Sequence, residues 1–349
     1  MAAQWLENYK SYGNNVSYMS DGLYAQATLR LLEDPDPNET GYVAKISDGF
    51  DILRKVLSGN KTTVGVAQRY WFPTLPVSDN IPYILRFCDE DNVIQTSLAV
   101  TSTGKLQVYR GGGVALLAES TGPVVVTNAW THIEMKVLFS QTVGTVEVRV
   151  NGVTVISATG LDTVQSAKVH CAQVSLDCDN ASDGVPRISM YCKDYFIWDG
   201  EGTHNNNFAG TVSIIDLIEE SDIDLGDWAP STGSTGFDLV NESPPDDAKY
   251  ISALTATTDP AVMTLSDLPE DVTSVRCLMT LVRSRKVDGG DGNLQVGLVS
   301  GSDVDLGADH PLTTAFTYYY DISEEDPATD APWSPSAVND ADIQFDRTI

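Results

Sequence analysis

WTHIEMKVLFSQTVGTVEVRVNGVTVIS, residues 130–157, is the stretch that decides the fold. Apolar and polar residues alternate from Thr131 to Phe139. This period of two predicts a β-strand with one apolar face and one polar face. We therefore expect His132 and Glu134 to point toward solvent.

The same stretch predicts two further strands. Alternation resumes from Val146 to Val150, and Asn151 and Gly152 follow directly. This pair is the strongest short hairpin signal, because both residues tolerate a positive φ. Residues 153–157 then continue as a third strand. The sequence predicts a three-stranded antiparallel meander.

Short strand-like segments recur on both sides of this meander, separated by Gly, Pro, Asn and Asp. Such spacing, about 8–12 residues, is typical of a β-sandwich. The sequence predicts an all-β protein with two antiparallel β-sandwich (jelly-roll) domains joined by an ordered Gly/Asn/Pro-rich crossing. The first domain is expected to span 1–235, including the connecting segment 199–235, and the second, smaller sandwich to span 236–349.

The chain is strongly acidic, with 49 Asp and Glu against 21 Lys and Arg and a formal net charge of -28. Such a surface repels phosphate backbones and anionic lipid headgroups, so nucleic-acid binding and direct membrane docking are not expected. The N-terminus has no basic region followed by an apolar run, and no apolar stretch is long enough to cross a bilayer. We expect neither a secretory signal nor membrane insertion.

The cysteines indicate neither a zinc site nor a thioredoxin motif, because the sequence has no Cys-x-x-Cys pair. We expect buried thiols in a protein that folds in a reducing cytosol. The five are Cys88, Cys171, Cys178, Cys192 and Cys277.

Catalytic patterns are missing from the sequence. No predicted strand carries the carboxylate spacing of jelly-roll glucanases, and no Gly-x-Ser-x-Gly elbow accompanies the four histidines. Glu134 and Glu147 are interpreted as cross-strand neighbours on a solvated sheet face. The four histidines are His132, His170, His204 and His310. We assign no catalytic residue, no cofactor-binding residue and no cofactor, and we expect no enzyme activity.

The segment 177–184 has the oxygen-rich composition of a calcium loop. Its spacing does not fit the EF-hand, so structural calcium stays open and no metal ligand is assigned. Its polar residues and closing glycine are Asp177, Asp179, Asn180, Asp183 and Gly184. A second carboxylate group at Asp288, Asp291 and residues 303–305 is interpreted as hairpin turns. The aromatic run 318–320 exposes one ring opposite the other two and could contact sugar, although interface or core positions are commoner.

Two resemblances add to this interpretation. A Trp-x-His-Ile strand followed by Val-x-Val-Asn-Gly, within 130–152, resembles concanavalin A-like and laminin G-like jelly rolls, which are often lectins. Several motifs are also similar to virion structural proteins of tailed bacteriophages. These motifs lie at 5–24, 198–210, 228, 246–250, 318–322 and 326–339.

The second resemblance implies a non-enzymatic component of a phage tail, fibre or baseplate, folded and assembled in the host cytoplasm. Its expected partners are other virion proteins and further copies of itself, with a trimer favoured. It leaves open contact between the first domain and host surface polysaccharide. The alternatives are a capsid-decorating protein of the same virion and, from another class, a jelly-roll carbohydrate-active enzyme or lectin.

Overall fold

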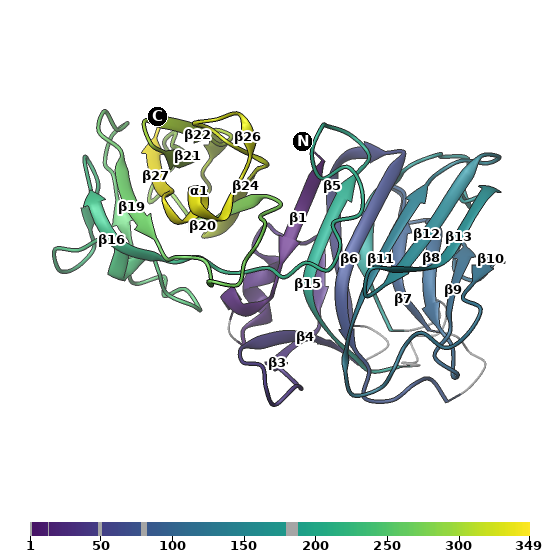
Figure 1. Ribbon diagram of the computed structural model, residues 1–349. Helices are drawn as coiled ribbons and strands as arrows, with labels where there is room; N and C mark the ends of the chain where they lie inside the picture. The colour runs from purple at the N-terminus through teal and green to yellow at the C-terminus, as the bar shows by residue number, and fades with distance from the viewer. Residues whose placement is uncertain (1, 13, 48–50, 78–81, 179–187) are drawn as a thin grey trace. The chain divides into compact units, whose positions relative to one another are not determined.

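The computed structural model describes every residue except 1, 13, 48–50, 78–81 and 179–187 (Figure 1). The predicted all-β fold class is confirmed, since strands account for 47% of the chain and helices for 5%. The chain divides into two compact units: unit 1 is Met1–Ser20 with Tyr24–Ile214, and unit 2 is Asp21–Leu23 with Ile215–Ile349. The expected division after residue 235 falls inside unit 2, because a strand at residues 219–224 already pairs there.

Unit 1 contains two antiparallel sheets, which we call sheet A and sheet B. The strands of sheet A, in spatial order, are β13 (Val153–Leu161), β12 (Gly144–Val150), β11 (Trp130–Leu138), β6 (Thr63–Trp71), β15 (Met190–Asp199), β4 (Tyr42–Ile46) and β3 (Arg30–Glu33), with β1 (Ala3–Glu7) also paired to β15. Those of sheet B are β10 (Ala115–Glu119), β9 (Leu106–Arg110), β8 (Ile94–Val100), β7 (Tyr83–Cys88), β14 (Cys171–Leu176), β5 (Ile52–Lys61) and β2 (Gln26–Thr28).

Figure 1 shows β6, β11, β12 and β13 side by side in one layer, with β7, β8 and β9 in the layer behind. Two 3-10 turns, η1 (Lys10–Tyr12) and η2 (Val16–Ser20), follow β1. In the early chain β1 comes first, and β2 and β3 pair in different sheets.

The predicted meander is confirmed. Val150 pairs with Ile133 across β11 and β12, and with Val153 across β12 and β13. The hairpin residues Asn151 and Gly152 have φ values of 48° and 79°, which is the left-handed conformation that the turn requires.

The core of unit 1 lies between the two sheets. On sheet A, Ile133, Met135 and Val148 are at most 2% exposed, and on sheet B so are Leu98 and Val174. The residues that alternate with them point to the outer face of their sheet. The sandwich therefore has two outer faces, and both carry polar side chains.

A polar network is also buried inside the sandwich. The Glu7 carboxylate accepts hydrogen bonds from the Tyr12 hydroxyl (2.6 Å) and the Tyr9 amide (2.7 Å). The Lys55 ammonium lies 3.4 Å from the centroid of the Trp5 ring. Burial lowers the pKa of Lys55 to about 7, against the opposing effect of Glu7.

Unit 2 is built on an antiparallel sheet with β16 (Glu219–Asp224), β19 (Ala261–Leu265), β27 (Asp342–Arg347), β21 (Asn293–Ser300) and β22 (Asp303–Leu306) in that order, and β23 (His310–Pro311) beside β21. Separate pairs are β20 (Leu278–Ser284) with β24 (Thr317–Ser323), β17 (Ala229–Pro230) with β18 (Ile251–Ser252), and β25 (Glu325–Asp326) with β26 (Ala331–Pro332). The helical segments are η3 (Phe237–Leu239) and the short helix α1 (Pro335–Asn339).

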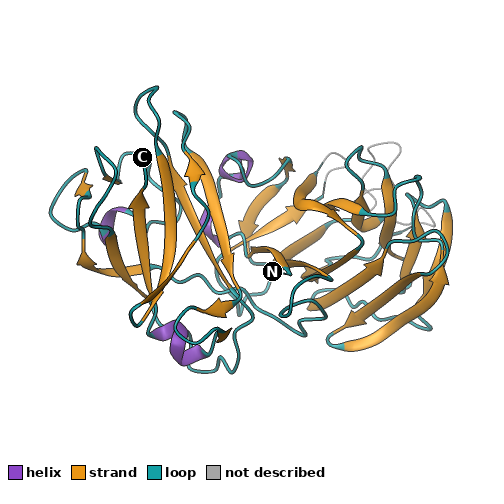
Figure 2. Cartoon of the chain, turned by 90° about the horizontal axis from the view of Figure 1, so that it is seen from above, coloured by secondary structure: helices purple, strands orange, loops and turns teal. Residues whose placement is uncertain are grey.

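The unit 2 core gathers around Met263 and Phe345, and the half-buried Trp228 packs against it. Figure 2, coloured by secondary structure, shows how little helix the two units contain. All five cysteines are buried, as expected, and form no disulfide within the described residues. Among the described residues, no helix is long and apolar enough to cross a membrane.

Candidate functional site

Three aromatic residues share one rung on the outer face of sheet A. Trp130 on β11 pairs with Trp71 on β6, and Trp71 pairs in turn with Tyr191 on β15. The two indole rings meet edge to face, with centroids 5.9 Å apart. We call Trp71, Trp130 and Tyr191 the aromatic row. Trp130 and Tyr191 are half-buried, and Trp71 is 9% exposed.

Two cations continue this rung. Tyr191 pairs with Lys45 on β4, and Lys45 pairs with Arg30 on β3. The Lys45 ammonium lies 5.3 Å from the Tyr191 ring centroid, a cation–π contact. Lys45 is half-buried and Arg30 is exposed. One line across five adjacent strands therefore offers three aromatic rings and then two positive charges, with no carboxylate among them.

The next rung is polar and mostly buried. Arg69 on β6 pairs with His132 on β11 and with Lys193 on β15. The Lys193 ammonium binds Asp34 (2.8 Å) and Glu39 (2.9 Å) and lies 4.3 Å from the Trp130 ring centroid. The single charge of Lys193 offsets one of these two negative charges beside Trp130.

His132 was expected to be solvated, and this expectation is wrong: the residue is 2% exposed. Within the part of the chain that the structure describes, neither ring nitrogen has a hydrogen-bond partner. Burial, helped by the nearby Arg69 charge, lowers the pKa of His132 to about 4. The imidazole is therefore neutral at pH 7.

The expected solvated pair of Glu134 and Glu147 is also wrong. Glu134 is fully buried, and its direct neighbour on β12 is Arg149, whereas Glu147 pairs with Lys136. The reason lies in the crossing that follows β15. The Gly210 amide donates to the Glu134 carboxylate at 3.0 Å, so a later part of the chain covers this part of the polar face. Alternation within β11 cannot reveal such a cover.

The segment that covers this face is residues 207–214, which we call the strap. Its Phe208 ring lies 3.7 Å from the Arg149 guanidinium carbon and 6.0 Å from the Trp198 ring centroid. Beneath Trp198, Gly65 leaves the room that the indole needs, because a Cβ there would lie 2.0 Å from the ring. These contacts agree with the expected ordered crossing, since Phe208 packs on side chains of unit 1.

The outer face of sheet B carries a different row. Arg54, Ser175, Arg86, Ser97 and Tyr109 follow one another in register across β5, β14, β7, β8 and β9. Ser97 and Ser175 are at most 1% exposed, whereas Arg54 and Tyr109 are half-buried.

The two arginines of this row differ in their ion pairs. Arg86 forms a buried ion pair with Asp177 at 2.6 Å. The Arg54 guanidinium donates to the Ser175 hydroxyl at 3.3 Å and makes no ion pair within the described residues. Arg54 is therefore the cation of this face that is ready to meet an anion.

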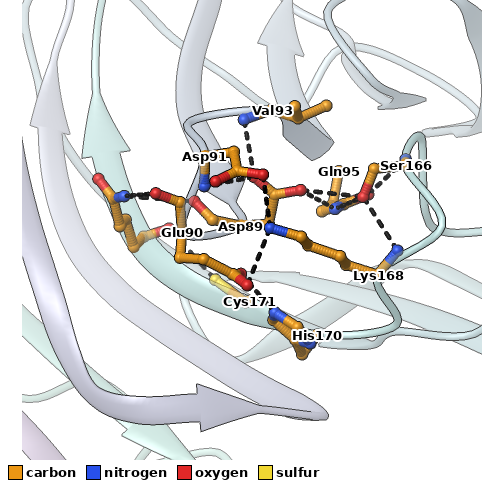
Figure 3. A network of polar contacts seen from close by, with 10 residues as sticks. Asp89, Glu90, Asp91, Val93, Gln95, Ser166, Lys168, His170 and Cys171 are labelled. Atoms are coloured by element: carbon orange, nitrogen blue, oxygen red, sulfur yellow. Dashed lines mark hydrogen bonds and ion pairs between the residues drawn. The ribbon is translucent and has the colours of Figure 1, made fainter.

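A polar network closes the turn between β7 and β8 (Figure 3). The Asp89 carboxylate, fully buried, accepts from the amides of Asp91 (3.0 Å) and Val93 (2.9 Å) and from the side chains of Gln95 (3.0 Å) and Ser166 (2.9 Å). All these donors are satisfied by one carboxylate, so the group fixes the turn and is not arranged for chemistry.

Lys168 and His170 lie at the edge of the same network. The Lys168 ammonium reaches both Glu90 (2.8 Å) and Asp91 (2.6 Å), and His170 lies 2.6 Å from Glu90 (Figure 3). The hydrogen bonds from Lys168 and His170 lower the pKa of Glu90 to about 2. These pairs are exposed and worth little in stability.

The outcome differs among the other sites that the sequence predicted. Most of the 177–184 calcium segment lies outside the described residues. Within the described part of the chain, no group of His, Cys, Asp and Glu could hold a metal ion. His310 pairs with Asp321 at 2.7 Å in unit 2. Of the aromatic run, Tyr318 is buried, whereas Tyr319 and Tyr320 are half-buried.

Sequence reasoning missed the aromatic row. Trp71, Trp130 and Tyr191 lie in three different strands, and their pairing depends on the strand order β11–β6–β15, which no local pattern contains. The available signal was an aromatic residue near one end of each strand.

No family model matches the chain, and no curated protein matches it. Solved structures with similar folds include an endo-beta-1,4-glucuronan lyase from Trichoderma reesei, with 8% identity, 56% of this chain and 94% of that chain covered, and a TM-score of 0.39. The alginate lyase Aly36B has 12% identity, covers 56% and 96%, and has a TM-score of 0.41. A Trypanosoma rangeli sialidase has 9% identity, covers 50% and 30%, and has a TM-score of 0.34.

The prediction of a non-enzymatic phage virion component, including the capsid-decorating alternative, is contradicted by this comparison, since the similar solved structures are lyases and sialidases. At these identities and TM-scores, the activities of those proteins are not transferred to this chain. The motif-level resemblance to tailed-phage proteins stays a prediction. The expected trimer and virion location stay predictions as well.

Proposed function

We propose that unit 1 binds an acidic polysaccharide on the outer face of sheet A. The observation that carries this proposal is the rung of Trp130, Trp71 and Tyr191 that ends in Lys45 and Arg30. Aromatic rings pack against the apolar C–H faces of sugars, and Lys and Arg bind carboxylates through charge-assisted hydrogen bonds. The combination fits a chain of uronate sugars.

The dimensions of the sheet support the same ligand. Adjacent strands are roughly 4.8 Å apart. A sugar residue in an extended polysaccharide advances the chain by a similar step. A polysaccharide that crosses the strands along the rung could therefore place successive sugars over successive side chains.

The overall charge makes the local cations necessary. A protein with a formal net charge of -28 repels a polyanion over most of its surface. Lys45 and Arg30 provide a local exception, because the rung contains no acidic residue. Binding that depends on two exposed or half-buried cations should weaken as salt is added, since salt screens such charges.

A second surface for the same ligand is the outer face of sheet B. The observation that favours it is Arg54, which makes no ion pair within the described residues and is half-buried at the end of the row that contains Tyr109. Tyr83 adds a further aromatic ring, whose centroid lies 6.0 Å from that of Tyr109. Arg54→Ala separates this surface from the aromatic row.

The test is calorimetric titration of the full chain with polygalacturonate, and with a neutral glucan of similar length. We compare wild type, Trp130→Ala, Lys45→Ala and Arg54→Ala. Tyr250→Ala is the matched control, because Tyr250 is an aromatic residue of unit 2 that is 43% exposed. The titrated samples are also assayed for new chain ends, so that any cleavage of the polymer is measured together with binding.

We expect micromolar to millimolar affinity for the acidic polymer, about tenfold weaker in Trp130→Ala and unchanged in Tyr250→Ala. Lys45→Ala should weaken binding of the acidic polymer and leave the neutral one unaffected. If Arg54→Ala alone removes binding, the ligand lies on sheet B. If wild type binds neither polymer, the proposal is wrong.

A further inference from the structure

The aromatic row occupies only part of the outer face of sheet A, and the strap covers the part that follows it. The polar contacts of the strap with this face go to charged side chains. The Asn207 side-chain oxygen Oδ1 accepts from Lys136 (3.1 Å), the Gly210 amide donates to Glu134 (3.0 Å), and the Ser213 hydroxyl accepts from Arg69 (2.6 Å). The Ile214 amide donates to Asp194 at 2.9 Å.

Phe208 supplies the apolar part of this contact. Its ring stacks near the guanidinium of Arg149 (3.7 Å) and lies within 6.0 Å of both the Trp198 ring centroid and the Lys136 ammonium. The Phe208 ring is held between an indole and two cations. These are the kinds of contact that a uronate sugar would make on the aromatic row. The strap therefore fills this part of the face as a ligand would.

The two cations under the strap differ in their other partners, because the Arg149 guanidinium also binds the Glu147 carboxylate at 2.8 Å. Lys136 makes no ion pair within the described residues, and among those residues its ammonium contacts Asn207 and Phe208, which both belong to the strap. His132, four residues away on the same strand and face, is 2% exposed, and neither ring nitrogen has a hydrogen-bond partner within the described residues. An unpartnered buried imidazole costs free energy. A polar ligand that replaced the strap could bind both groups.

The strap is held by side-chain contacts and not by strand pairing. Residues 207–214 form no strand with sheet A, and Asn207, Thr211 and Ser213 are exposed. Most of its contacts with the face are single hydrogen bonds to side chains, each worth about 1–3 kcal/mol. A segment held in this way can leave the face without breaking a ladder of backbone hydrogen bonds.

We propose that the strap is a displaceable cover over a second group of sugar subsites, in which Lys136 and Arg149 bind the carboxylate of a uronate residue and Trp198 supports its ring. This inference rests on the proposed function, because it extends the aromatic row along the same face. Short oligosaccharides fill only the aromatic row, whereas longer oligosaccharides must displace the strap to reach the subsites beneath it.

The test uses the full chain and oligogalacturonides of increasing length, with affinity measured by calorimetry. The variants are Phe208→Ala, which removes the ring, and Ser213→Ala, which removes one polar contact and leaves the aromatic residues in place. Phe316→Ala is the matched control, because Phe316 also stacks on an arginine, Arg285 at 4.6 Å, but lies in unit 2. The thermal unfolding midpoint of each variant checks that the fold is intact.

In wild type, affinity should rise with chain length until the row is filled and then level off. In Phe208→Ala, the longer chains should bind about tenfold tighter, with short chains unchanged, and Ser213→Ala should shift affinity in the same direction by less. Equal affinity of wild type and Phe208→Ala for every length, in variants that remain folded, would overturn the inference.

The double variant Trp130→Ala/Phe208→Ala separates this inference from the proposed function. If wild type binds no oligomer but the strap variants do, the aromatic row is not the site and the subsites under the strap are. If no variant binds any oligomer, both proposals fail. Tighter binding in Phe316→Ala would also count against the strap, because the effect would then not depend on its position.

Discussion

Trp71 and Trp130 face each other directly across the antiparallel pair of β6 and β11, and their rings meet edge to face at an interplanar angle of 64°. This contact fixes the orientation of the half-buried Trp130 ring. The indole is held further by a hydrogen bond from Trp130 Nε1 to Asp34 at 3.1 Å. A preorganised ring loses little conformational entropy when a ligand binds.

The contact between the two tryptophans should be measurable as a coupling energy. We expect Trp71→Leu and Trp130→Leu each to lower the free energy of unfolding, and the double variant to lose less than the sum, by about 0.5–1.5 kcal/mol. Urea unfolding of the four proteins measures this difference. Simple additivity would mean that the rings do not stabilise each other.

The buried His132 should make stability depend on pH. The pKa of His132 is lowered to about 4 in the folded protein, whereas the unfolded chain titrates near pH 6.5. Between these values the unfolded state binds more protons, so the free energy of unfolding falls as pH is lowered. The loss is at most about 3 kcal/mol, complete near pH 4.

The comparison for this prediction is His132→Gln, which cannot gain a proton in that range. Its free energy of unfolding should fall less than that of wild type between about pH 6.5 and pH 4. His204→Gln is the control, because His204 is only half-buried. The same pH dependence in His132→Gln and wild type would show that His132 is not the group responsible.

Lys55 should also make the free energy of unfolding fall as the pH is lowered, but over a higher pH range than His132. Burial lowers the pKa of Lys55 to about 7, and the unfolded chain titrates near 10.4. The unfolded state therefore binds more protons between these values, and stability contributed at Lys55 rises with pH. Relative to wild type, Lys55→Met should gain most near about pH 7, and the difference should shrink by roughly 3 kcal/mol toward about pH 9.5. A difference that stays constant over this range would contradict the assignment.

Gly65→Ala should be strongly destabilising. The added Cβ would lie 2.0 Å from the Trp198 ring, which is fully buried between Gly65 and the strap. Either the indole or the strand must move, and we expect a loss of about 3 kcal/mol or more. Gly122→Ala is the control, because nothing lies within 4 Å of that position. Equal thermal midpoints for the two variants would contradict the close packing.

Asp89→Ala should loosen the turn between β7 and β8. The substitution leaves four donors without their acceptor, and we expect a loss of about 2–4 kcal/mol. The exposed neighbour Asp91 provides the control, since Asp91→Ala removes only a screened contact with Lys168. Hydrogen exchange of residues 89–95 reports the change, which should be absent in Asp91→Ala. Similar exchange in both variants would show that Asp89 does not hold the turn.

The local sequence pattern predicted the strands, but it did not predict which segments cover them. Alternation through residues 131–139 correctly assigned Ile133 and Met135 to the core, because side-chain direction in a strand is set by the backbone. The same pattern placed Glu134 in solvent, where the structure has it buried under Gly210. The covering residue, Gly210, lies 76 positions later in the chain. The sequence of the strand therefore does not show that the strand is covered.

The division of the chain shows the same limit. Gly, Asn and Pro correctly indicated irregular chain after Asp199, but residues 219–224 form β16, which pairs with β19. Its sequence, EESDID, is polar and exposed along most of its length, so it lacks the apolar signal of a core strand. The functional prediction was wrong for a related reason, because motif resemblance does not show which side chains meet on a sheet face.

Hydroxyl-radical footprinting tests the central claim most directly, because it locates the ligand on the protein. Oxidation of Trp130 and Tyr191 is measured by mass spectrometry with and without polygalacturonate, with the exposed Tyr250 of unit 2 as the internal reference. We predict that the polymer slows oxidation of Trp130 and Tyr191 and leaves Tyr250 unchanged. Equal oxidation of the aromatic row with and without a polymer that demonstrably binds the protein would contradict the account.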